Sequence, residues 1–431
     1  MQFSAANSTS SQLSLRARAA ICAGRSAAQI SRRLGRGAGG VIGGRVASFI
    51  DSDITQKISR SMQVALVTGT NGKSTTTKML NFALRATAPT AYNDHGDNME
   101  SGVSAALLEN PQAPFAALEI DEMHLGIVAD MVHPEVFVLL NLTRDQLDRV
   151  GSPAHVQQRI AQSIARYPQA TVIANCDDPL IAAAVWNHSS VVWVAAGAQW
   201  EADSQDFPLG GKVERCGAQW QVGDKYRRPE PEWWVEEESL LHRQQDGTVQ
   251  RYPLQLRLPG EYNRGNAAQA VAAAAVLGVA PEISLPEIAK ITSVAGRYGR
   301  YQWEEKNIRM LLAKNPAGWQ ETLRTVEKAQ ALLLAVNAQV PDGEDASWLR
   351  DIDFGVLPEK IGGMPVYISG EAVAELQECL EKVGITPQVV ESPAAALTAL
   401  PMGKIEVVAN YTAFRDIKNI LDRSGASVTE A

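Results

Sequence analysis

The feature that most constrains the fold of this sequence is a glycine-containing loop between a strand pattern and a helix pattern. Residues 63–68 are apolar, as in a buried strand, and residues 75–86 carry apolar side chains at helical spacing. The loop that joins them reads Gly69-Thr70-Asn71-Gly72-Lys73-Ser74. Glycines allow a backbone to approach a phosphate, helix amides point at the anion, and the lysine and serine can hold charge and Mg²⁺. We therefore predict a phosphate site here, although the G-x-x-G-K-S spacing differs from that of common P-loops.

The segments around this loop predict a parallel sheet covered by helices. Apolar strand patterns recur at residues 115–120, 136–140 and 171–174, and helical stretches such as 153–167 separate them. Alternation of this kind is typical of α/β domains. It breaks at about residues 197–257, where tryptophan, glycine, proline and charged residues crowd together. We interpret that segment as a small β-rich insertion.

A second, smaller α/β domain with Rossmann-like alternation is predicted at the C-terminal end. Strand patterns appear at residues 331–336, 366–369 and 405–409, beyond a boundary near residues 296–318. A chain of 431 residues is also too long for a single core. The predicted parts are a basic N-terminal segment at 1–57, a central ATP-binding domain at 58–297 and a C-terminal domain at 298–431.

Composition excludes several classes of protein. No run of about 18 apolar residues occurs, so no transmembrane helix is predicted. Four scattered cysteines without a CxxC pair argue against a disulfide framework and fit a reducing, cytoplasmic compartment. The net charge of −8 argues against a general nucleic-acid binder.

The N-terminal segment has an unusual charge. Residues 1–50 contain seven arginines and no lysine or acid, so they carry +7 while the rest of the chain sums to −15. An organellar transit peptide, a basic arm that contacts anionic lipid or a partner, and a poorly ordered terminus all share this composition. We expect the segment to face the membrane or a partner.

Acidic side chains follow two of the other predicted strands. Glu119 ends the strand at 115–120, and ligands bind at the carboxyl ends of parallel strands. A carboxylate there can hold Mg²⁺ against ATP phosphates, although a surface acidic cluster has the same pattern. Asp145 and Asp148 lie one helical turn apart, which suits metal or substrate positioning and equally suits an exposed first helical turn.

Together these residues resemble the Mur ligase superfamily of ATP-dependent amide-forming enzymes. Residues 68–75 look like that family's own ATP loop, Glu119 matches its Mg²⁺ carboxylate, and residues 261–268 match its asparagine motif beside adenine. The resemblance implies ATP and Mg²⁺ as cofactors, with Ser74 and Glu119 on the metal and Lys73 and Glu119 in catalysis. The implied nucleotide-binding residues are Gly69, Thr70, Asn71, Gly72, Lys73, Ser74, Thr75, Asn263, Asn266 and Arg297.

Four segments resemble the amidating branch of this superfamily, at residues 92–99, 119–122, 313–318 and 342–348. That resemblance implies a carbon–nitrogen ligase subunit that forms a heterodimer with a glutaminase of the GatD type. The implied reaction converts the α-carboxylate of D-glutamate in the stem peptide of lipid II, the membrane-linked peptidoglycan precursor, into D-isoglutamine. It proceeds through an acyl phosphate that ammonia attacks. The expected location is the cytoplasm, peripheral to the inner face of the membrane.

The resemblance also assigns a catalytic role to Asp345. A glutaminase uses a cysteine activated by a histidine, which works best when a carboxylate orients it. Asp345 is expected to approach the partner's histidine and complete a triad across the interface. The alternative is that Asp345 only caps the turn before Trp348, and Asp342 and Asp351 are the nearest rivals for the role.

The insertion departs from the pattern of this branch, which usually carries a four-cysteine zinc ribbon. Only Cys216 remains, and Val213 stands at the leading cysteine position. One thiolate cannot form a closed tetrahedral site, so we expect the zinc site to be lost. Packing of Trp220, Trp233 and Trp234 is expected to hold this degenerate ribbon instead.

Other functions remain open. A stand-alone Mur-type or folylpolyglutamate-type ligase would turn over ATP with an amino acid and without a partner. A nucleotide-binding scaffold would bind ATP without turnover. Gln146 stands where many Mur ligases have a histidine, which puts a second metal ion in doubt.

Overall fold

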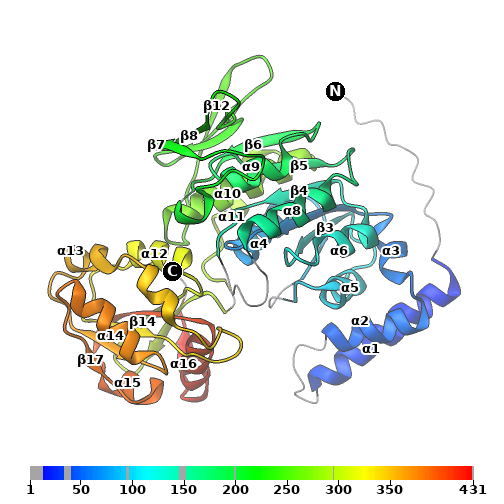
Figure 1. The fold of residues 1–431 in the computed structure, drawn as a ribbon. Helices are drawn as coiled ribbons and strands as arrows, with labels where there is room; N and C mark the ends of the chain where they lie inside the picture. Colours follow the sequence, from blue (N-terminus) through cyan, green and yellow to red (C-terminus); the bar gives the residue numbers. More distant parts are fainter. Residues whose placement is uncertain are drawn as a thin grey trace.

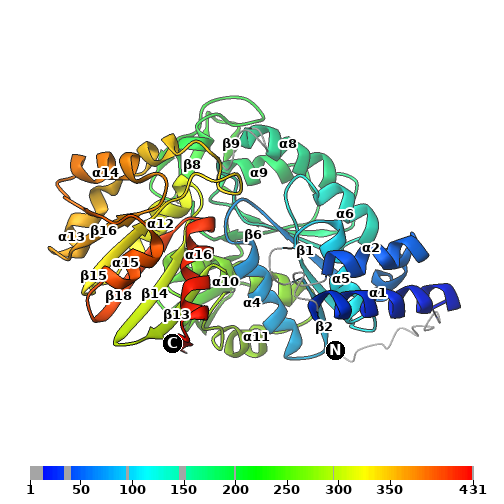
Figure 2. The same ribbon diagram turned by 90° about the horizontal axis from the view of Figure 1, so that it is seen from below.

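The computed structural model describes residues 13–33, 40–93, 97–144, 152–198, 200–294 and 296–429. Two sheet domains lie next to each other, and a pair of N-terminal helices packs at the end of the central domain that is remote from the C-terminal domain (Figures 1 and 2). The predicted α/β fold, with a larger central sheet and a smaller C-terminal sheet, is confirmed.

The central domain is built on a sheet in which nine described strands take the order β12-β11-β10-β6-β5-β4-β1-β3-β2. All neighbours from β10 to β2 run parallel, and β11 and β12 add an antiparallel edge. The strands are β1 (Gln63–Thr68), β2 (Thr90–Tyr92), β3 (Phe115–Glu119), β4 (Val136–Leu139), β5 (Thr171–Asn175), β6 (Val191–Ala195), β10 (Trp233–Glu236), β11 (Ser239–Arg243) and β12 (Val249–Pro253).

Helices cover both faces of this sheet. In β1 the side chains of Ala65 and Val67 enter the core under one layer of helices, and those of Val64 and Leu66 enter the core under the other. Strands buried on both faces are continuously apolar, which is why their sequence pattern is clear. The first layer contains α4 (Lys73–Arg85), α10 (Glu261–Val276) and α11 (Pro281–Ile288); the second contains α3 (Ile54–Ser59), α5 (Glu100–Glu109), α6 (Leu125–Val132), α8 (Pro153–Ile164) and α9 (Pro179–Val185).

The insertion is β-rich, but it is divided between two sheets. A small antiparallel sheet follows the short helix η1 (Ala202–Ser204), and its strands are β7 (Glu214–Cys216), β8 (Gln219–Val222) and β9 (Tyr226–Arg227). Trp220 is buried there against Phe207. The expectation that Trp233 and Trp234 also hold this small sheet is wrong, because both lie on β10 of the main sheet, where Trp233 stacks on His242.

We predict that the purified protein holds no stoichiometric zinc. Cys216 is exposed, and the described part of the chain contains no group of three or more His, Cys, Asp or Glu side chains that could bind a metal. Apolar and aromatic contacts around Trp220 stabilise the small sheet instead. Elemental analysis by plasma mass spectrometry tests the prediction, and one zinc per chain that survives dialysis against chelator would contradict it.

The C-terminal domain has seven described strands in the order β17-β16-β15-β18-β14-β13-β19. The five from β17 to β14 run parallel, and β13 and β19 extend the sheet antiparallel. The strands are β13 (Tyr298–Trp303), β14 (Lys306–Leu312), β15 (Ala331–Ala335), β16 (Val366–Ser369), β17 (Gln388–Val389), β18 (Gly403–Ala409) and β19 (Ser427–Val428). The helices are α12 (Pro316–Thr325), η2 (Ser347–Asp351), η3 (Phe354–Val356), α13 (Leu357–Ile361), α14 (Val373–Lys382), α15 (Pro393–Ala399) and α16 (Tyr411–Arg423).

Much of the N-terminal segment is helical, which its composition did not reveal. Helices α1 (Leu15–Arg33) and α2 (Gly40–Ile50) pack on each other and on α5. A Cβ atom on Gly24 would lie 2.8 Å from the carbonyl oxygen of Gly43, and the reverse distance is the same. Glycine at both positions therefore lets the two backbones approach closely. Residues 1–12 and 34–39 lie outside the described part of this segment.

Candidate active site

The glycine loop between β1 and α4 has a backbone that requires its glycines. Gly69 and Gly72 have φ values of 137° and 88°. A Cβ atom on Gly69 would lie 2.9 Å from Leu140, and one on Gly72 would lie 2.7 Å from the side-chain oxygen of Asn266. Gly72 is also the N-cap of α4 and provides no side-chain cap, so the first amides of the helix remain available to an anion.

Asparagine and threonine side chains beyond β4 fix this loop. The Asn141 side chain accepts a hydrogen bond from the Asn71 backbone N–H and donates one to the Asn71 carbonyl, both at 3.0 Å. The Thr143 backbone N–H donates to the Thr70 hydroxyl at 3.0 Å. The loop is thus held in shape without a ligand. Asp145, Gln146 and Asp148, which follow in sequence, lie outside the described residues.

Lys73 is buried and held by acceptors within the loop and beyond β3. Its Nζ donates to the Gly69 carbonyl at 2.6 Å and lies 3.1 Å from a carboxylate oxygen of Glu122. The side chains of Lys73 and Glu122 are only 6% and 9% exposed. Sequence analysis placed Lys73 in the loop but gave no role to Glu122 as its counter-charge.

The side chains of Ser74 and Glu119 meet at the start of α4. The Ser74 hydroxyl donates to Glu119 Oε2 at 2.6 Å. Glu119 Oε1 is buried and accepts no hydrogen bond from a described residue, and it lies 3.9 Å from the Arg297 guanidinium. Asn93 fixes the Glu119 backbone through two hydrogen bonds of 2.7 Å. A buried carboxylate oxygen without a donor, beside a hydroxyl, suits Mg²⁺, which prefers oxygen ligands.

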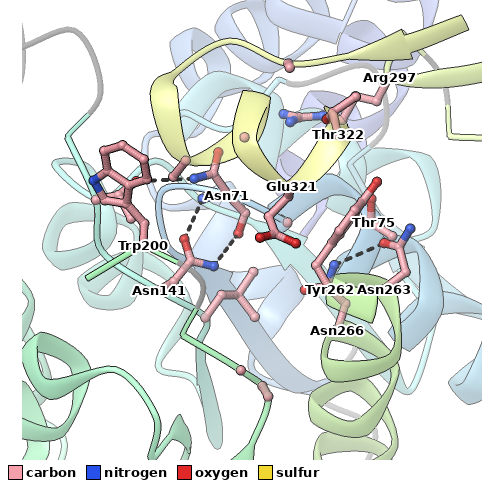
Figure 3. Close-up of a pocket in the computed structure, with 18 of the residues that line it drawn as sticks. Asn71, Thr75, Asn141, Trp200, Tyr262, Asn263, Asn266, Arg297, Glu321 and Thr322 are labelled. Atoms are coloured by element: carbon pink, nitrogen blue, oxygen red, sulfur yellow. Dashed lines mark hydrogen bonds between the residues drawn. The ribbon is translucent and has the colours of Figure 1, made fainter. Parts of the chain in front are cut away.

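A cavity lies between the central and C-terminal domains, directly beside the loop. Figure 3 shows Asn71 and Thr75 from the loop side and Asn263 and Asn266 from α10, with Arg297 beyond them. The side-chain amide of Asn266 donates a hydrogen bond to the side-chain oxygen of Asn263 at 3.2 Å, so the two side chains are held together. The cavity also contains residues that the sequence analysis did not select, namely Asn141, Asn175, Trp200, Tyr262, Glu321 and Thr322.

The two domains contact each other at the loop itself. The Asn315 side chain, at the N-cap of α12, donates to Asn71 Oδ1 at 3.1 Å, while Asn71 donates to the Thr143 hydroxyl at 3.2 Å. Asn71 therefore connects the central domain to the C-terminal domain. Asn315 lies in the segment 313–318, which resembles the amidating branch of the superfamily. The sequence did not predict that this segment contacts the loop.

Glu321 of α12 points into the cavity (Figure 3) and has a perturbed acidity. Burial raises its pKa from 4.5 to about 7, and this effect outweighs the opposing ion pair with Arg324. Burial also raises the pKa of the neighbouring Tyr262 to about 12. Near neutral pH the Glu321 carboxyl group is therefore protonated in part of the molecules.

We predict that Glu321→Gln stabilises the ligand-free protein at pH 8 and has almost no effect on its stability at pH 4. A carboxyl with a raised folded-state pKa binds more protons when folded, so stability falls as pH rises from about 4.5 to 7. The raised pKa corresponds to at most about 3 kcal/mol at pH 8, which the substitution removes. Thermal unfolding should show a Tm increase of several degrees at pH 8 only. The exposed Glu261→Gln is the matched control, and a Tm increase of equal size at both pH values would contradict the prediction.

Asp345 lies apart from this cavity, on the exposed surface of the C-terminal domain. Its carboxylate accepts hydrogen bonds from the Ser347 backbone N–H at 2.8 Å and the Ser347 hydroxyl at 2.9 Å. These bonds lower its pKa, so the group is a carboxylate at neutral pH. Two other aspartates were candidates for the role of Asp345. Asp342 is buried and accepts a hydrogen bond from the Thr412 backbone N–H, and the Asp351 carboxylate lies 3.5 Å from the Arg144 guanidinium.

Two family models match the chain. Residues 67–274 match the Mur ligase middle domain, and residues 312–414 match the MurT ligase C-terminal domain. Among solved structures, MurF from Acinetobacter baumannii has a TM-score of 0.64 at 18% identity, over 88% of this chain and 80% of that one. A pseudomurein peptide ligase from Methanothermus fervidus has the same TM-score and identity, over 86% and 81%. The chain belongs to the Mur ligase superfamily of ATP-dependent ligases, whose members use ATP and Mg²⁺.

Within this superfamily the chain is of the MurT type. It is 29% identical to the MurT subunit of the glutamine-hydrolysing lipid II isoglutaminyl synthase of Streptococcus pneumoniae, over 79% of this chain and 81% of that protein. It is 26% identical to the MurT subunit of the same enzyme from Staphylococcus aureus, over 92% and 96%. The resemblance found in the sequence is therefore confirmed for nearly the whole chain.

Proposed function

We propose that this chain is the ligase subunit of a lipid II isoglutaminyl synthase. It would use ATP to amidate the α-carboxylate of D-glutamate in the lipid II stem peptide. The observation that carries the proposal is the likeness to two MurT subunits along most of the chain, together with a preformed phosphate loop and oxygen ligand pair. The loop and the Ser74–Glu119 pair fit both amidation and the addition of an amino acid, so the likeness to the MurT subunits is what favours amidation.

The chemistry that we propose begins with activation of the carboxylate. A carboxylate is a poor electrophile until phosphorylation gives it a leaving group, so the reaction passes through an acyl phosphate. The amides at the start of α4 and the Lys73 ammonium would stabilise charge on the phosphoryl group during transfer. Glu119 and Ser74 would hold Mg²⁺, which supplies further charge neutralisation.

The cavity beside the loop is proposed to bind the nucleotide. It is lined by Asn263, Asn266 and Arg297, and Asn266 also packs against Gly72 of the loop. A nucleotide whose phosphates lie at the loop would place its base towards α10 and its phosphates within reach of Arg297. The nucleotide would lie between the two domains, because Glu321 and Thr322 of the C-terminal domain also line the cavity.

Ammonia is proposed to come from a glutaminase subunit of the GatD type, bound to the C-terminal domain as a 1:1 heterodimer. The support is that the matching relatives are named as subunits of a glutamine-hydrolysing enzyme. The exposed, ionised carboxylate of Asp345 is available to a partner's histidine. The substrate is lipid-linked, so we propose that the protein acts in the cytoplasm, at the inner face of the membrane.

Amidation of lipid II with purified components tests the proposal. The chain is mixed with its co-purified glutaminase partner, glutamine, ATP and Mg²⁺, and the product is identified by mass spectrometry. With unlabelled glutamine, the expected change is a loss of about 1 Da per stem peptide. With glutamine that carries 15N in its side-chain amide, the product should be about 1 Da heavier than the unlabelled product. If the chain turns over ATP in the absence of the partner, and only when an amino acid is added, it is a stand-alone ligase. ATP binding without turnover would indicate a scaffold.

A further inference from the structure

The helical hairpin of α1 and α2 carries an unusual surface. Four large apolar side chains are exposed on these helices of 19 and 11 residues: Leu15 (83%), Ile30 (58%), Ile42 (43%) and Phe49 (91%). Water-facing positions of an ordinary surface helix are polar. These four exposed apolar side chains therefore lie on two helices that pack on each other.

Arginines share the helix faces on which these apolar side chains lie. In α2, Ile42, Arg45 and Phe49 are spaced i, i+3 and i+7, so they lie on one face. In α1, Leu15 and Arg33 are five turns apart on one face, within about 60° of Ile30. We call these six residues the hairpin face.

Two arginines of the hairpin face, Arg33 and Arg45, differ from the other arginines of the hairpin in their contacts. Arg25 donates to the Leu108 carbonyl and Arg32 pairs with Glu109, so these two fix the hairpin to α5. Arg33 and Arg45 are exposed, and no described residue forms a hydrogen bond or ion pair with either. The first acid of the chain is Asp51, so the hairpin has only positive charges. The rest of the chain carries −15.

We propose that the hairpin face is a docking surface for an anionic lipid bilayer. Exposed Phe and Leu enter the boundary between headgroups and acyl chains, and arginines on the same helices bind anionic headgroups. The acidic remainder of the protein is repelled by such a bilayer, so the charge asymmetry orients the hairpin towards it. Among the described helices, none is long and apolar enough to span a membrane.

A bilayer fits these observations better than a protein partner does. A protein interface that received this face would need acidic groups at each unpaired arginine and pockets of matching shape for the apolar side chains. A fluid anionic bilayer provides negative charge for the arginines and an apolar interior for the exposed side chains, and it needs no matching shape. The inference does not depend on the proposed reaction, although a lipid-linked substrate would give the contact a use.

Flotation of the full-length protein with vesicles tests the inference without substrate, ATP or partner. One set of vesicles contains phosphatidylglycerol and phosphatidylcholine, and the other contains phosphatidylcholine only. The wild type should float with the anionic set and at least tenfold less with the uncharged set. L15E/F49E and R33E/R45E should each reduce flotation at least tenfold. The matched control M402E changes an apolar side chain with 66% exposure in the C-terminal domain and should float like the wild type.

Three results would overturn the inference: no flotation of the wild type, unchanged flotation of both double variants, or equal flotation with uncharged vesicles. The complex with the purified glutaminase subunit provides a further test. If this complex no longer floats with the vesicles, the subunit covers the hairpin face, and the face would be assigned to that subunit instead of a bilayer. Unfolding curves of each variant show whether a loss of flotation comes from the changed surface or from unfolding of the protein. Because no amidation is measured, these results are independent of whether the proposed function is correct.

Discussion

Replacement of Lys73 by alanine is expected to reduce ATP-dependent amidation at least about 100-fold. A donor that stabilises developing charge in a desolvated site contributes roughly 2.7–4 kcal/mol to the barrier. The Lys73 ammonium lies inside the loop, next to the Gly69 carbonyl. Single-turnover phosphorylation of the substrate carboxylate, measured at saturating ATP, checks the effect on chemistry rather than on binding.

Burial of Lys73 makes a second variant necessary. Loss of the ammonium leaves the Glu122 carboxylate buried without its counter-charge, which costs about 3–5 kcal/mol in typical buried pairs. Lys73→Ala/Glu122→Gln removes both charges and should recover most of the lost stability. Activity should stay low in the double variant. If the double variant regained a tenth or more of wild-type amidation, the assigned role of Lys73 in phosphoryl transfer would be wrong.

Asp345→Asn is expected to abolish glutamine hydrolysis by the partner while the ligase site stays intact. Loss of the orienting carboxylate costs roughly 10⁴-fold in a serine-protease triad, and we expect at least about 100-fold here. Asparagine can still accept the hydrogen bond from the Ser347 backbone N–H, so the turn is preserved. Complex formation and ATP binding should be unchanged. Added ammonium salt should then restore amidation.

Ser347→Ala separates a catalytic role of Asp345 from a structural one. This variant keeps the carboxylate but removes the hydroxyl that donates to it at 2.9 Å. If Asp345 only stabilises the turn, Ser347→Ala and Asp345→Asn should have similar effects on glutamine hydrolysis. If Asp345 orients the partner's histidine, the serine variant should keep most of the activity. Normal hydrolysis by the Asp345→Asn complex would exclude the role outright.

The elements that the sequence predicted best are those with strong local signals. The strand before the loop, β1, and its two neighbours in the sheet, β3 and β4, are buried on both faces, so each is a largely apolar run between turns. The loop itself is short, and its glycines are required by local backbone geometry at Gly69 and Gly72. Such features depend on residues that are neighbours in sequence and can be identified there.

Features that depend on distant residues could not be predicted in this way. The contact of Asn71 with Asn315 and the entry of Glu321 into the cavity join segments that lie more than 200 positions apart. The pattern around Trp233 and Trp234 showed that they are in strands but not which sheet the strands join. The hairpin of α1 and α2 was missed because Ala, Gly, Ser and Arg are also typical of unstructured segments.

The hydrogen bond between Asn71 and Asn315 has a consequence for the timing of turnover. In the proposed complex, a glutaminase subunit bound to the C-terminal domain would move with that domain, and the Asn315 amide joins the domain to the glycine loop. A hinge motion that separates the two domains would break this bond and would carry the bound subunit away from the loop. The path of free ammonia would then be shortest while the two domains are in contact. The same hinge motion would govern both nucleotide exchange and the escape of ammonia into solvent.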